Sequence, residues 1–470
     1  MAGESLTALI NQLQAEVLAL RQQVASLQAE NAALRSENGT LREENDRLRK
    51  QLALVERQSA RQAAPFRRRE TKKVPPAQKK RPGRQPGHPG SCRVVPQQID
   101  ETAEVPLEAC PQCGRPVRDK RRVEQIIEEI PQVRPRVTRV ITYEALCPCC
   151  GDVYSTHPLQ TSRARGAAKV QLGPRALATA AQLNKGLGLP MRKTCSVLKQ
   201  LAGLRLTGGG LSQALFRIAH KTAVAGEYRE MTTQLRAASA VYADETSWWV
   251  GGPGAWLWVY TTPTQTHYLV EDGRGHGVVH KVLGKDYAGT LVSDCLATYD
   301  VPTCRKHKCI AHHLRAIEKA RELSKTRDPT YLDSCQQLFQ DVIALHKQHS
   351  QLPPEEFAQQ RDALQARCDD LLAQSVKQPG DVKIQNRLFK QRAHLLTCLY
   401  YPEVEPTNNR AERQLRPAVI ARKVSCGNKT PEGAECWQIL ASLAATCAQQ
   451  ARSFIDYLAP RLPLAATVSG

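Results

Sequence analysis

The sequence lacks the features that mark a secreted or membrane-embedded protein. No run of about 18 consecutive apolar residues occurs anywhere in the chain. The N-terminus has no basic stretch followed by an apolar one, which is the pattern of a signal peptide. The 16 cysteines are scattered, many of them single and inside apolar stretches, and this favours reduced thiols over a disulfide framework. These absences predict a soluble cytoplasmic protein that contacts no membrane.

Acidic residues are also too few to balance the basic ones. The 470 residues include 66 lysines and arginines but only 45 aspartates and glutamates, which gives a net charge of +21. A surface of this sign attracts polyanions, and nucleic acid is the first candidate. The length exceeds that of a typical single domain, so we expect about two or three packed units with connecting segments.

Residues 1–56 repeat apolar side chains every seven positions. Leucine holds one seam position, while β-branched residues and asparagine hold most of the other. This combination favours a parallel two-stranded coiled coil, in which asparagine fixes register and partner number. We predict a homodimer or higher oligomer formed through this zipper; the alternative is a single amphipathic helix packed on a globular core. The leucine seam comprises Leu6, Leu13, Leu20, Leu27, Leu34, Leu41 and Leu48.

Residues 57–105 form a basic segment that is rich in proline and glycine. Such a composition cannot build a core. Its charge density suits phosphate contacts that weaken steeply with salt, so we predict DNA binding; a solvated linker without DNA contact is the alternative. The predicted contacts are Arg67, Arg68, Arg69, Lys79, Lys80, Arg81 and Arg84.

Residues 106–160 contain two CxxC pairs, on either side of a segment rich in Val and Ile from Val123 to Tyr143. Two such knuckles at the ends of a β-hairpin direct four thiolates at one ion, which is the arrangement of a tetrahedral structural Zn²⁺. The alternative is a chance pairing in a cysteine-rich chain. The predicted ligands are Cys110, Cys113, Cys147 and Cys150, with Cys149 as a substitute in the second pair.

Residues 161–237 have helical apolar spacing from about Gly173 to Arg236, with breaks expected at Gly186 to Pro190 and at Gly208 to Gly210. Short helices joined by tight turns are typical of a helix-turn-helix, and the segment after Gly210 would then read DNA. A helical bundle that merely braces the next domain has the same pattern.

The apolar period changes to that of strands near residue 240. Strands are predicted at Ala240 to Thr246, Ala255 to Thr261, Thr266 to Val270 and Gly289 to Ser293. Asp244 lies within the first strand and Asp294 follows the last one directly. A carboxylate inside an apolar strand is costly unless a cation pairs with it, so Asp244 is either a metal ligand or a buried salt-bridge partner.

Glu412 follows a Thr-Asn-Asn start that suits a helix N-cap, and it would supply a third carboxylate. Three carboxylates can hold two divalent ions about 3.5 to 4 Å apart, a clamp for in-line displacement at phosphorus. Hard oxygen ligands and phosphate favour Mg²⁺, with Mn²⁺ as a substitute. The sequence therefore predicts catalytic and metal-binding roles for Asp244, Asp294 and Glu412.

Four motifs together resemble the insertion sequence sixty-six family of bacterial transposases, and the likeness extends to the zipper, the Pro82 to His88 stretch, the paired CxxC module and a helical end near Ile455 to Leu458. The motifs are Tyr242-Ala-Asp244-Glu-Thr246-Ser-Trp248, Leu291-Val-Ser-Asp294 with Tyr299, Cys309-Ile-Ala-His312-His-Leu-Arg315, and Pro406-Thr-Asn-Asn-Arg-Ala-Glu412-Arg-Gln-Leu-Arg416-Pro417.

The resemblance implies a multidomain α/β chain whose catalytic domain, residues 238–425, is ribonuclease-H-like, with two aspartates and a glutamate at its metal site. It also implies cut-and-join chemistry, in which water cleaves the end of the element and the freed 3′ hydroxyl attacks target DNA. Residues 316–400 are helical in pattern and form an insertion that shapes the DNA channel, or alternatively a lid or dimer surface. Residues 426–470 form a C-terminal helical tail.

Further basic residues near the carboxylates are predicted to contact DNA. His312 and Arg315 match the family motif and can reach the scissile phosphate, although a hydrogen-bonded interior histidine fits equally well. A basic run behind Glu412 is predicted to bind phosphates, with a solvated face as the alternative. It comprises Arg413, Arg416, Arg422 and Lys423.

The predicted function is a transposase of a bacterial insertion sequence that acts in the cytoplasm, at the nucleoid. Its partners are double-stranded DNA, as terminal inverted repeats and target, and accessory proteins of the same element. One rival is a DNA-binding regulator or an inactive transposase relic, which binds but performs no chemistry. A second rival is a nuclease of the same fold, which cleaves but does not join.

Overall fold

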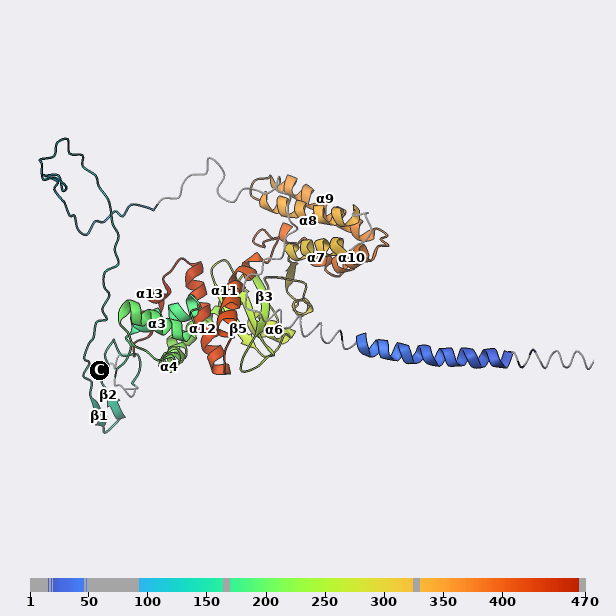
Figure 1. Cartoon of the computed structure of the whole chain (residues 1–470), viewed down its shortest axis with the longest axis horizontal. Coiled ribbons are helices and arrows are strands. Elements are labelled where there is room, and N and C mark those ends of the chain that lie inside the picture. Colours follow the sequence, from blue (N-terminus) through green and yellow to red (C-terminus); the bar gives the residue numbers. More distant parts are fainter. Residues whose placement is uncertain are drawn as a thin grey trace, which may run out of the picture. The chain divides into compact units, whose positions relative to one another are not determined.

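The protein is described here by a computed structural model that covers residues 20–45, 93–163, 170–323 and 330–464, together with Glu16, Leu18 and Leu48 (Figure 1). The chain divides into two compact units, residues 1–83 and 84–470, and each is described by itself. The predicted DNA contacts between Arg67 and Arg84 lie outside the described residues.

In the N-terminal unit, residues 20–45 form one uninterrupted helix that continues through Gly39. Leucines of the predicted seam are about half exposed along it, as in Leu20 (60%), Leu34 (51%) and Leu41 (51%). An apolar stripe of this kind on a solvated helix is the surface that a coiled coil covers. The helical state agrees with the heptad pattern, and the dimer remains a prediction.

The cysteine-containing segment differs from the predicted hairpin. Strands β1 (Glu144–Cys147) and β2 (Gly151–Tyr154) pair antiparallel, so the hairpin is built around the second CxxC pair. No strand forms in the described residues 123–142, where a strand was expected. The physical reason is Pro131 and Pro135, because each proline removes a backbone donor that strand pairing needs.

Short helices follow, as the spacing predicts. The break predicted at Gly186 to Pro190 is present, whereas the second break comes earlier than expected, at residues 203–207. Thr207 caps the next helix by accepting a hydrogen bond from the Gly210 N–H at 3.1 Å, so Gly208 to Gly210 begin a helix instead of interrupting one. The elements are α2 (Pro174–Ala181), the π-helix η2 (Gln182–Gly186), α3 (Met191–Ala202), α4 (Gly208–Ala219) and α5 (Thr222–Ala237).

A five-stranded mixed sheet forms the centre of the larger unit. Its order is β5-β4-β3-β6-β7, in which β4 pairs antiparallel with β5 and β3, while β6 pairs parallel with β3 and β7. The four predicted strands are confirmed, while β7 was not predicted. The strands are β3 (Ala240–Trp248), β4 (Ala255–Thr261), β5 (Thr266–Glu271), β6 (Thr290–Ser293) and β7 (Arg305–Lys308).

Alternate residues of the sheet enter two different cores, because successive side chains of a strand point to opposite faces. Tyr242 and Val292 belong to the core that includes α11 (Asn409–Ser425) and α12 (Pro431–Gln449). Val241 and Leu291 belong to the core that includes α5 and α6 (His276–Leu283). The sheet is therefore covered on both faces. Trp248 and Trp258 are buried in these cores, which agrees with a packing role.

Between β7 and α11 the chain forms the predicted helical insertion, whose buried residues, such as Phe339 and Leu388, join the core on the α11 face of the sheet. Figure 1 shows these helices as one group. The predicted insertion, residues 316–400, begins within α7 (Ile310–Leu323) and continues through α8 (Thr330–Lys347), α9 (Pro354–Ala373), α10 (Pro379–Lys390) and the 3₁₀ turns η4 (Arg392–His394) and η5 (Thr397–Leu399).

The C-terminal helices share a core with α2 to α5. Leu440 of α12 and Leu458 of α13 (Phe454–Leu458) pack with Leu177, Leu211 and Leu215. The predicted C-terminal tail and the predicted DNA-binding helices thus stabilise each other. Across the described part of the chain, every helix is too short or too polar to cross a membrane.

Candidate active site

Asp244 lies on β3, and Asp294 directly follows the neighbouring parallel strand β6. Tyr242 of β3 pairs with Val292 of β6, and each aspartate lies two residues further along its own strand direction. Adjacent strands are about 4.8 Å apart, so the two carboxylates begin from neighbouring backbone positions. Tyr242 and Val292 face the core that includes α11. Side chains two residues apart on a strand lie on the same face, so Asp244 and Asp294 are directed toward α11 as well.

Glu412 lies in the first turn of α11, and Asn408 fixes where this helix begins. The Asn408 amide does not cap its own helix. Instead its Nδ2 donates to the Ala243 carbonyl at 2.7 Å, and its backbone N–H donates to Cys309 Sγ at 3.0 Å. Since Ala243 precedes Asp244, this buried asparagine ties the Glu412 helix to the strand that carries the first aspartate.

The three carboxylates are close enough to influence one another. Burial, the charge of Glu245 and the charges of Asp294 and Glu412 together raise the pKa of Asp244 to about 7, although the Glu245 N–H that donates to it opposes the shift. An aspartate in this state is unstable as an anion unless a cation joins it. That is the electrostatic condition expected of a ligand site.

The side chains nevertheless do not point at one common spot. Glu412 Oε1 accepts from Arg315 Nη2 at 2.7 Å, and His312 Nε2 lies 3.8 Å away from the same oxygen. Within the described residues, no group of three or more His, Cys, Asp or Glu side chains is arranged to hold a metal ion. We attribute the difference to Arg315, whose guanidinium neutralises Glu412 and takes up one of its oxygens.

The residues fit a divalent ion in their chemistry. All three are hard carboxylate oxygen donors, which Mg²⁺ and Mn²⁺ prefer. Burial first, and then the charges of neighbouring acids, raise the pKa of Asp244, so its anion is destabilised here. A bound cation would remove that repulsion, and Glu412 would exchange Arg315 for the ion.

On the opposite face of β3, the buried carboxylate of Glu245 pairs with Arg274. The Glu245 side chain is only 1% exposed and accepts hydrogen bonds from Arg274 Nε at 2.9 Å and from the Tyr299 hydroxyl at 2.5 Å. Tyr299 lies in the short turn η3 (Ala297–Asp300) that follows Asp294. The contact therefore joins the segment after the second aspartate to the strand of the first.

Lys308 of β7 holds the same segment from the other side. Its fully buried ammonium donates to the Asp294 carbonyl at 3.1 Å and to Ser293 Oγ at 3.2 Å, and forms an ion pair with Asp300 at 2.7 Å. Burial alone would raise the pKa of Asp300, but the hydrogen bond and charge of Lys308 lower it. The backbone of Asp294 is thus fixed by a charged network that the sequence pattern did not reveal.

Comparison with known proteins identifies the family. A profile of the Transposase IS66 family matches residues 169–436, which is more than half of the chain and contains Asp244, Asp294 and Glu412. The chain belongs to this transposase family.

A more distant relative is the uncharacterised protein y4qI of Sinorhizobium fredii, which is 23% identical over 309 residues. The alignment covers 58% of this chain and 56% of that protein, so the chain spans little more than half the length of the curated relative it matches.

The basic residues predicted to contact DNA behind Glu412 differ in their exposure in this IS66-family chain. Arg413, Arg416 and Lys423 are exposed on α11. Arg422 is half-buried and donates to Thr246 Oγ1 at 3.1 Å and to Ser247 Oγ at 2.8 Å, so it holds α11 on β3. Burial lowers the pKa of Arg422, and burial lowers the pKa of His312, with the charge of Arg315 acting in the same direction.

The two cysteine pairs form separate turns, and the pKa of the first thiol of each pair is lowered. Backbone hydrogen bonds from Gln112 and Cys113 lower the pKa of Cys110, and those from Cys150 and Cys149 lower the pKa of Cys147. Gly114 (φ 71°) and Gly151 (φ 74°) follow the two pairs in the left-handed region that such turns require. Each pair therefore lies in its own turn, and the described residues contain no cluster of His, Cys, Asp or Glu side chains that joins the two.

Replacing Asp244 tests the electrostatics directly. The folded-state pKa of about 7 exceeds the ordinary value of 3.8, so the folded chain binds more protons than the unfolded one between these values and loses stability as pH rises through this window. Asp244→Asn should therefore stabilise the metal-free protein by up to about 4 kcal/mol at pH 8 and by little at pH 4. Thermal unfolding midpoints at the two pH values measure this, with exposed Asp370→Asn as the control; an equal shift at both values would contradict the assignment.

Proposed function

We propose that the chain is a transposase that cleaves and joins DNA at the ends of a bacterial insertion sequence, with Asp244, Asp294 and Glu412 as its catalytic carboxylates. The observation that carries the proposal is the proximity of the elements that bear these residues: β3 and β6 pair in parallel register, and Asn408 at the start of α11 donates to the Ala243 carbonyl of β3. The family match supports the activity, since it spans all three residues.

The strand order supports a ribonuclease-H-like catalytic domain. Three antiparallel strands are followed by two parallel ones, and the first aspartate lies on the central strand. The second aspartate follows the neighbouring parallel strand, and the glutamate comes from a helix on one face of the sheet. The long insertion, residues 316–400 in our proposal, separates the second aspartate from the glutamate.

Asp244, Asp294 and Glu412 would hold two Mg²⁺ or Mn²⁺ ions. Such ions supply Lewis-acid activation of the attacking oxygen and stabilisation of the leaving oxygen at phosphorus. The protein itself positions the carboxylates: Lys308 fixes the backbone of Asp294, and Asn408 fixes the helix that carries Glu412. Arg315, once it leaves Glu412, is a cation placed to meet a DNA phosphate beside the carboxylates.

The remaining parts position DNA. Exposed Arg413, Arg416 and Lys423 would contact phosphates along α11, with the basic linker adding further contacts. Cys110, Cys113, Cys147 and Cys150 would bind one structural Zn²⁺, with Cys149 able to replace a ligand of the second pair. The N-terminal zipper would join two chains, so that two DNA ends meet in one complex, and accessory proteins of the element would complete it.

The proposal is tested with the full chain and a linear duplex that carries the inverted repeats flanking its gene. We expect cleaved ends and joined products when Mg²⁺ or Mn²⁺ is added, and neither without added divalent ion. Cleavage without joined products would instead support a nuclease of the same fold. Specific binding with no cleavage under any of these conditions would support a DNA-binding regulator.

A further inference from the structure

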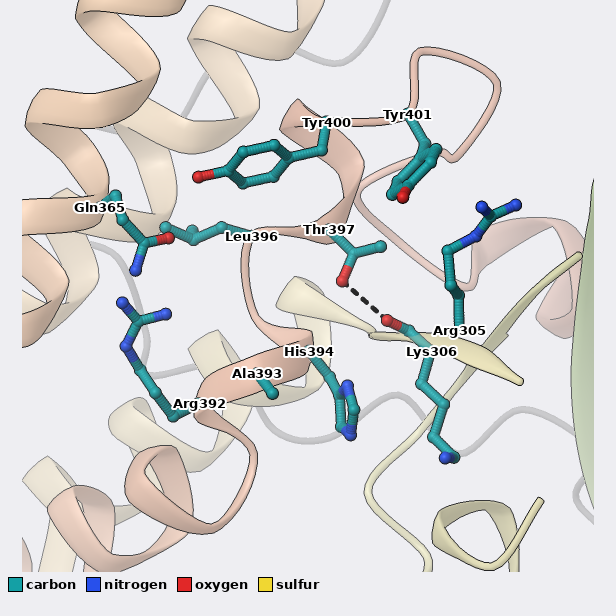
Figure 2. A pocket seen from close by; sticks show the side chains of 10 residues that line it. All are labelled: Arg305, Lys306, Gln365, Arg392, Ala393, His394, Leu396, Thr397, Tyr400 and Tyr401. Atoms are coloured by element: carbon teal, nitrogen blue, oxygen red, sulfur yellow. Dashed lines mark hydrogen bonds between the residues drawn. The ribbon is translucent and has the colours of Figure 1, made fainter. Parts of the chain in front are cut away.

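A pocket lies where the helical insertion returns to the sheet, at the beginning of β7. Its volume is about 300 Å³, and it is lined by Arg305 of β7, Gln365 of α9 and residues of the turns between Arg392 and Tyr401. Figure 2 shows Arg305 beside Tyr401, and Arg392 beside Gln365 across the pocket. This site shares no residue with the carboxylate site.

The cations of the pocket are not equivalent. Arg392 is committed to Asp369, to which it donates two hydrogen bonds of 2.5 and 2.7 Å. Arg305 is exposed, and no described carboxylate forms an ion pair with it. Its guanidinium lies 4.2 Å from the centre of the Tyr401 ring, and its Nε makes only a long contact of 3.4 Å with Thr290 Oγ1. The charge of Arg305 therefore remains available to an anion.

The pocket that Arg305 lines also has an aromatic wall, formed by Tyr400 and Tyr401. Tyr400 is 45% exposed, although it follows a tightly packed turn, and Arg361 lies 4.5 Å from its ring centre. Leu396 gives the pocket an apolar wall, and the Gln365 amide supplies hydrogen-bonding groups. The exposed ring of Tyr400 and the unpaired Arg305 line one pocket, and an aromatic ring together with a free arginine can bind an unstacked base and its phosphate.

The size of the pocket and its position restrict the kind of ligand further. Ligand pockets range from about 300 to 1,000 Å³, so this one holds a single small unit and excludes a paired duplex. Arg305 pairs with Thr290 in the sheet, whereas Ser293, which precedes Asp294, pairs with Lys308. Arg305 and Lys308 are three residues apart on β7, so their backbones lie about 10 Å apart along the strand. This corresponds to about three nucleotides of a duplex strand at 3.4 Å each.

We infer that this pocket binds one unpaired nucleotide of the DNA substrate, with the base against Tyr400 and its phosphate at Arg305. The inference rests on the proposed function, because it takes DNA as the ligand. It adds a site that holds the strand locally unpaired near the carboxylates. The insertion thereby contributes a strand-distorting contact in addition to its packing role.

The test uses the full chain without divalent ions and three duplexes of one sequence: fully paired, with one unpaired base, and with an abasic residue in place of that base. Binding should be about 5- to 10-fold tighter for the unpaired base than for the abasic residue. Tyr400→Leu should reduce this ratio to about one, while Tyr400→Phe keeps it, since stacking needs only the ring. Arg305→Gln should reduce the slope of log affinity against log salt by about 0.9.

Exposed Lys347→Gln of α8 is the matched control and should leave the base preference unchanged. Absence of a preference for the base, or a preference that survives Tyr400→Leu, would overturn the inference. The assay separates this claim from the proposed function, because it needs no cleavage. A chain that cleaves DNA but shows no base preference loses the pocket assignment alone, and a base preference without cleavage leaves the pocket in place.

Discussion

Asp294→Asn is expected to reduce DNA cleavage by about 1,000-fold or more while leaving DNA binding intact. In the proposed site this carboxylate would hold ions that stabilise the transition state by several kcal/mol, and each 1.36 kcal/mol corresponds to tenfold in rate. Glu412→Gln and Asp244→Asn should have losses of the same order, because the three residues act as one unit. The measurement is nicking of the linear end substrate in Mg²⁺, with affinity determined beside it.

Matched control substitutions test whether the loss of cleavage is specific to the three carboxylates. Asp286→Asn and Glu403→Gln replace exposed acids outside the site and should retain cleavage. Variants of the three carboxylates should not be additive, so a double variant should be no slower than the slower single one. Full cleavage by any one of the three single variants would remove that residue from the catalytic set.

Removing zinc is the second change with a large expected effect. A structural Zn²⁺ contributes about 10–16 kcal/mol to small cysteine modules, which are unfolded without it. Chelation, or Cys110→Ser with Cys147→Ser, should therefore leave residues 106–160 open to proteolysis while residues 170–464 stay folded. One zinc per chain by elemental analysis is the expected starting state, and affinity for DNA should fall as the module is lost.

The control is Cys195→Ser, which replaces a single cysteine of α3 outside both pairs and should change neither zinc content nor proteolysis of the module. Cys149→Ser tests the substitute ligand, and retention of zinc in this variant would leave Cys150 as the fourth ligand. A protein that contains no zinc when purified, with a module equally resistant before and after chelation, would contradict the prediction.

The sheet could be predicted from sequence where burial alone determines the pattern. β3, β4, β5 and β6 are apolar strands, so their positions follow from period-two spacing. β7 was not predicted because its sequence, Arg-Lys-His-Lys, is typical of a surface segment. Three of its four residues are buried, and Lys308 is tolerated there because Asp300 and Ser293 satisfy its charge.

The candidate site likewise has a part that the sequence could predict and a part that it could not. The carboxylates could be chosen from motifs, because a charged residue in or directly after an apolar strand is visible in the sequence. The contacts that arrange them join distant residues: Asn408 with Ala243, and Arg315 with Glu412. No local pattern encodes such pairs. The N-cap expected from the Thr-Asn-Asn start does not form through the Asn408 side chain, because the amide donates to the Ala243 carbonyl of β3 instead of capping the helix.

The most direct test of the catalytic assignment is a crystal structure of the full chain grown with Mn²⁺, in which anomalous scattering locates the ions. We predict two ions between Asp244, Asp294 and Glu412, with Arg315 displaced from the Glu412 carboxylate. Anomalous density absent from this position at saturating Mn²⁺, with Glu412 still paired to Arg315, would contradict the two-metal site.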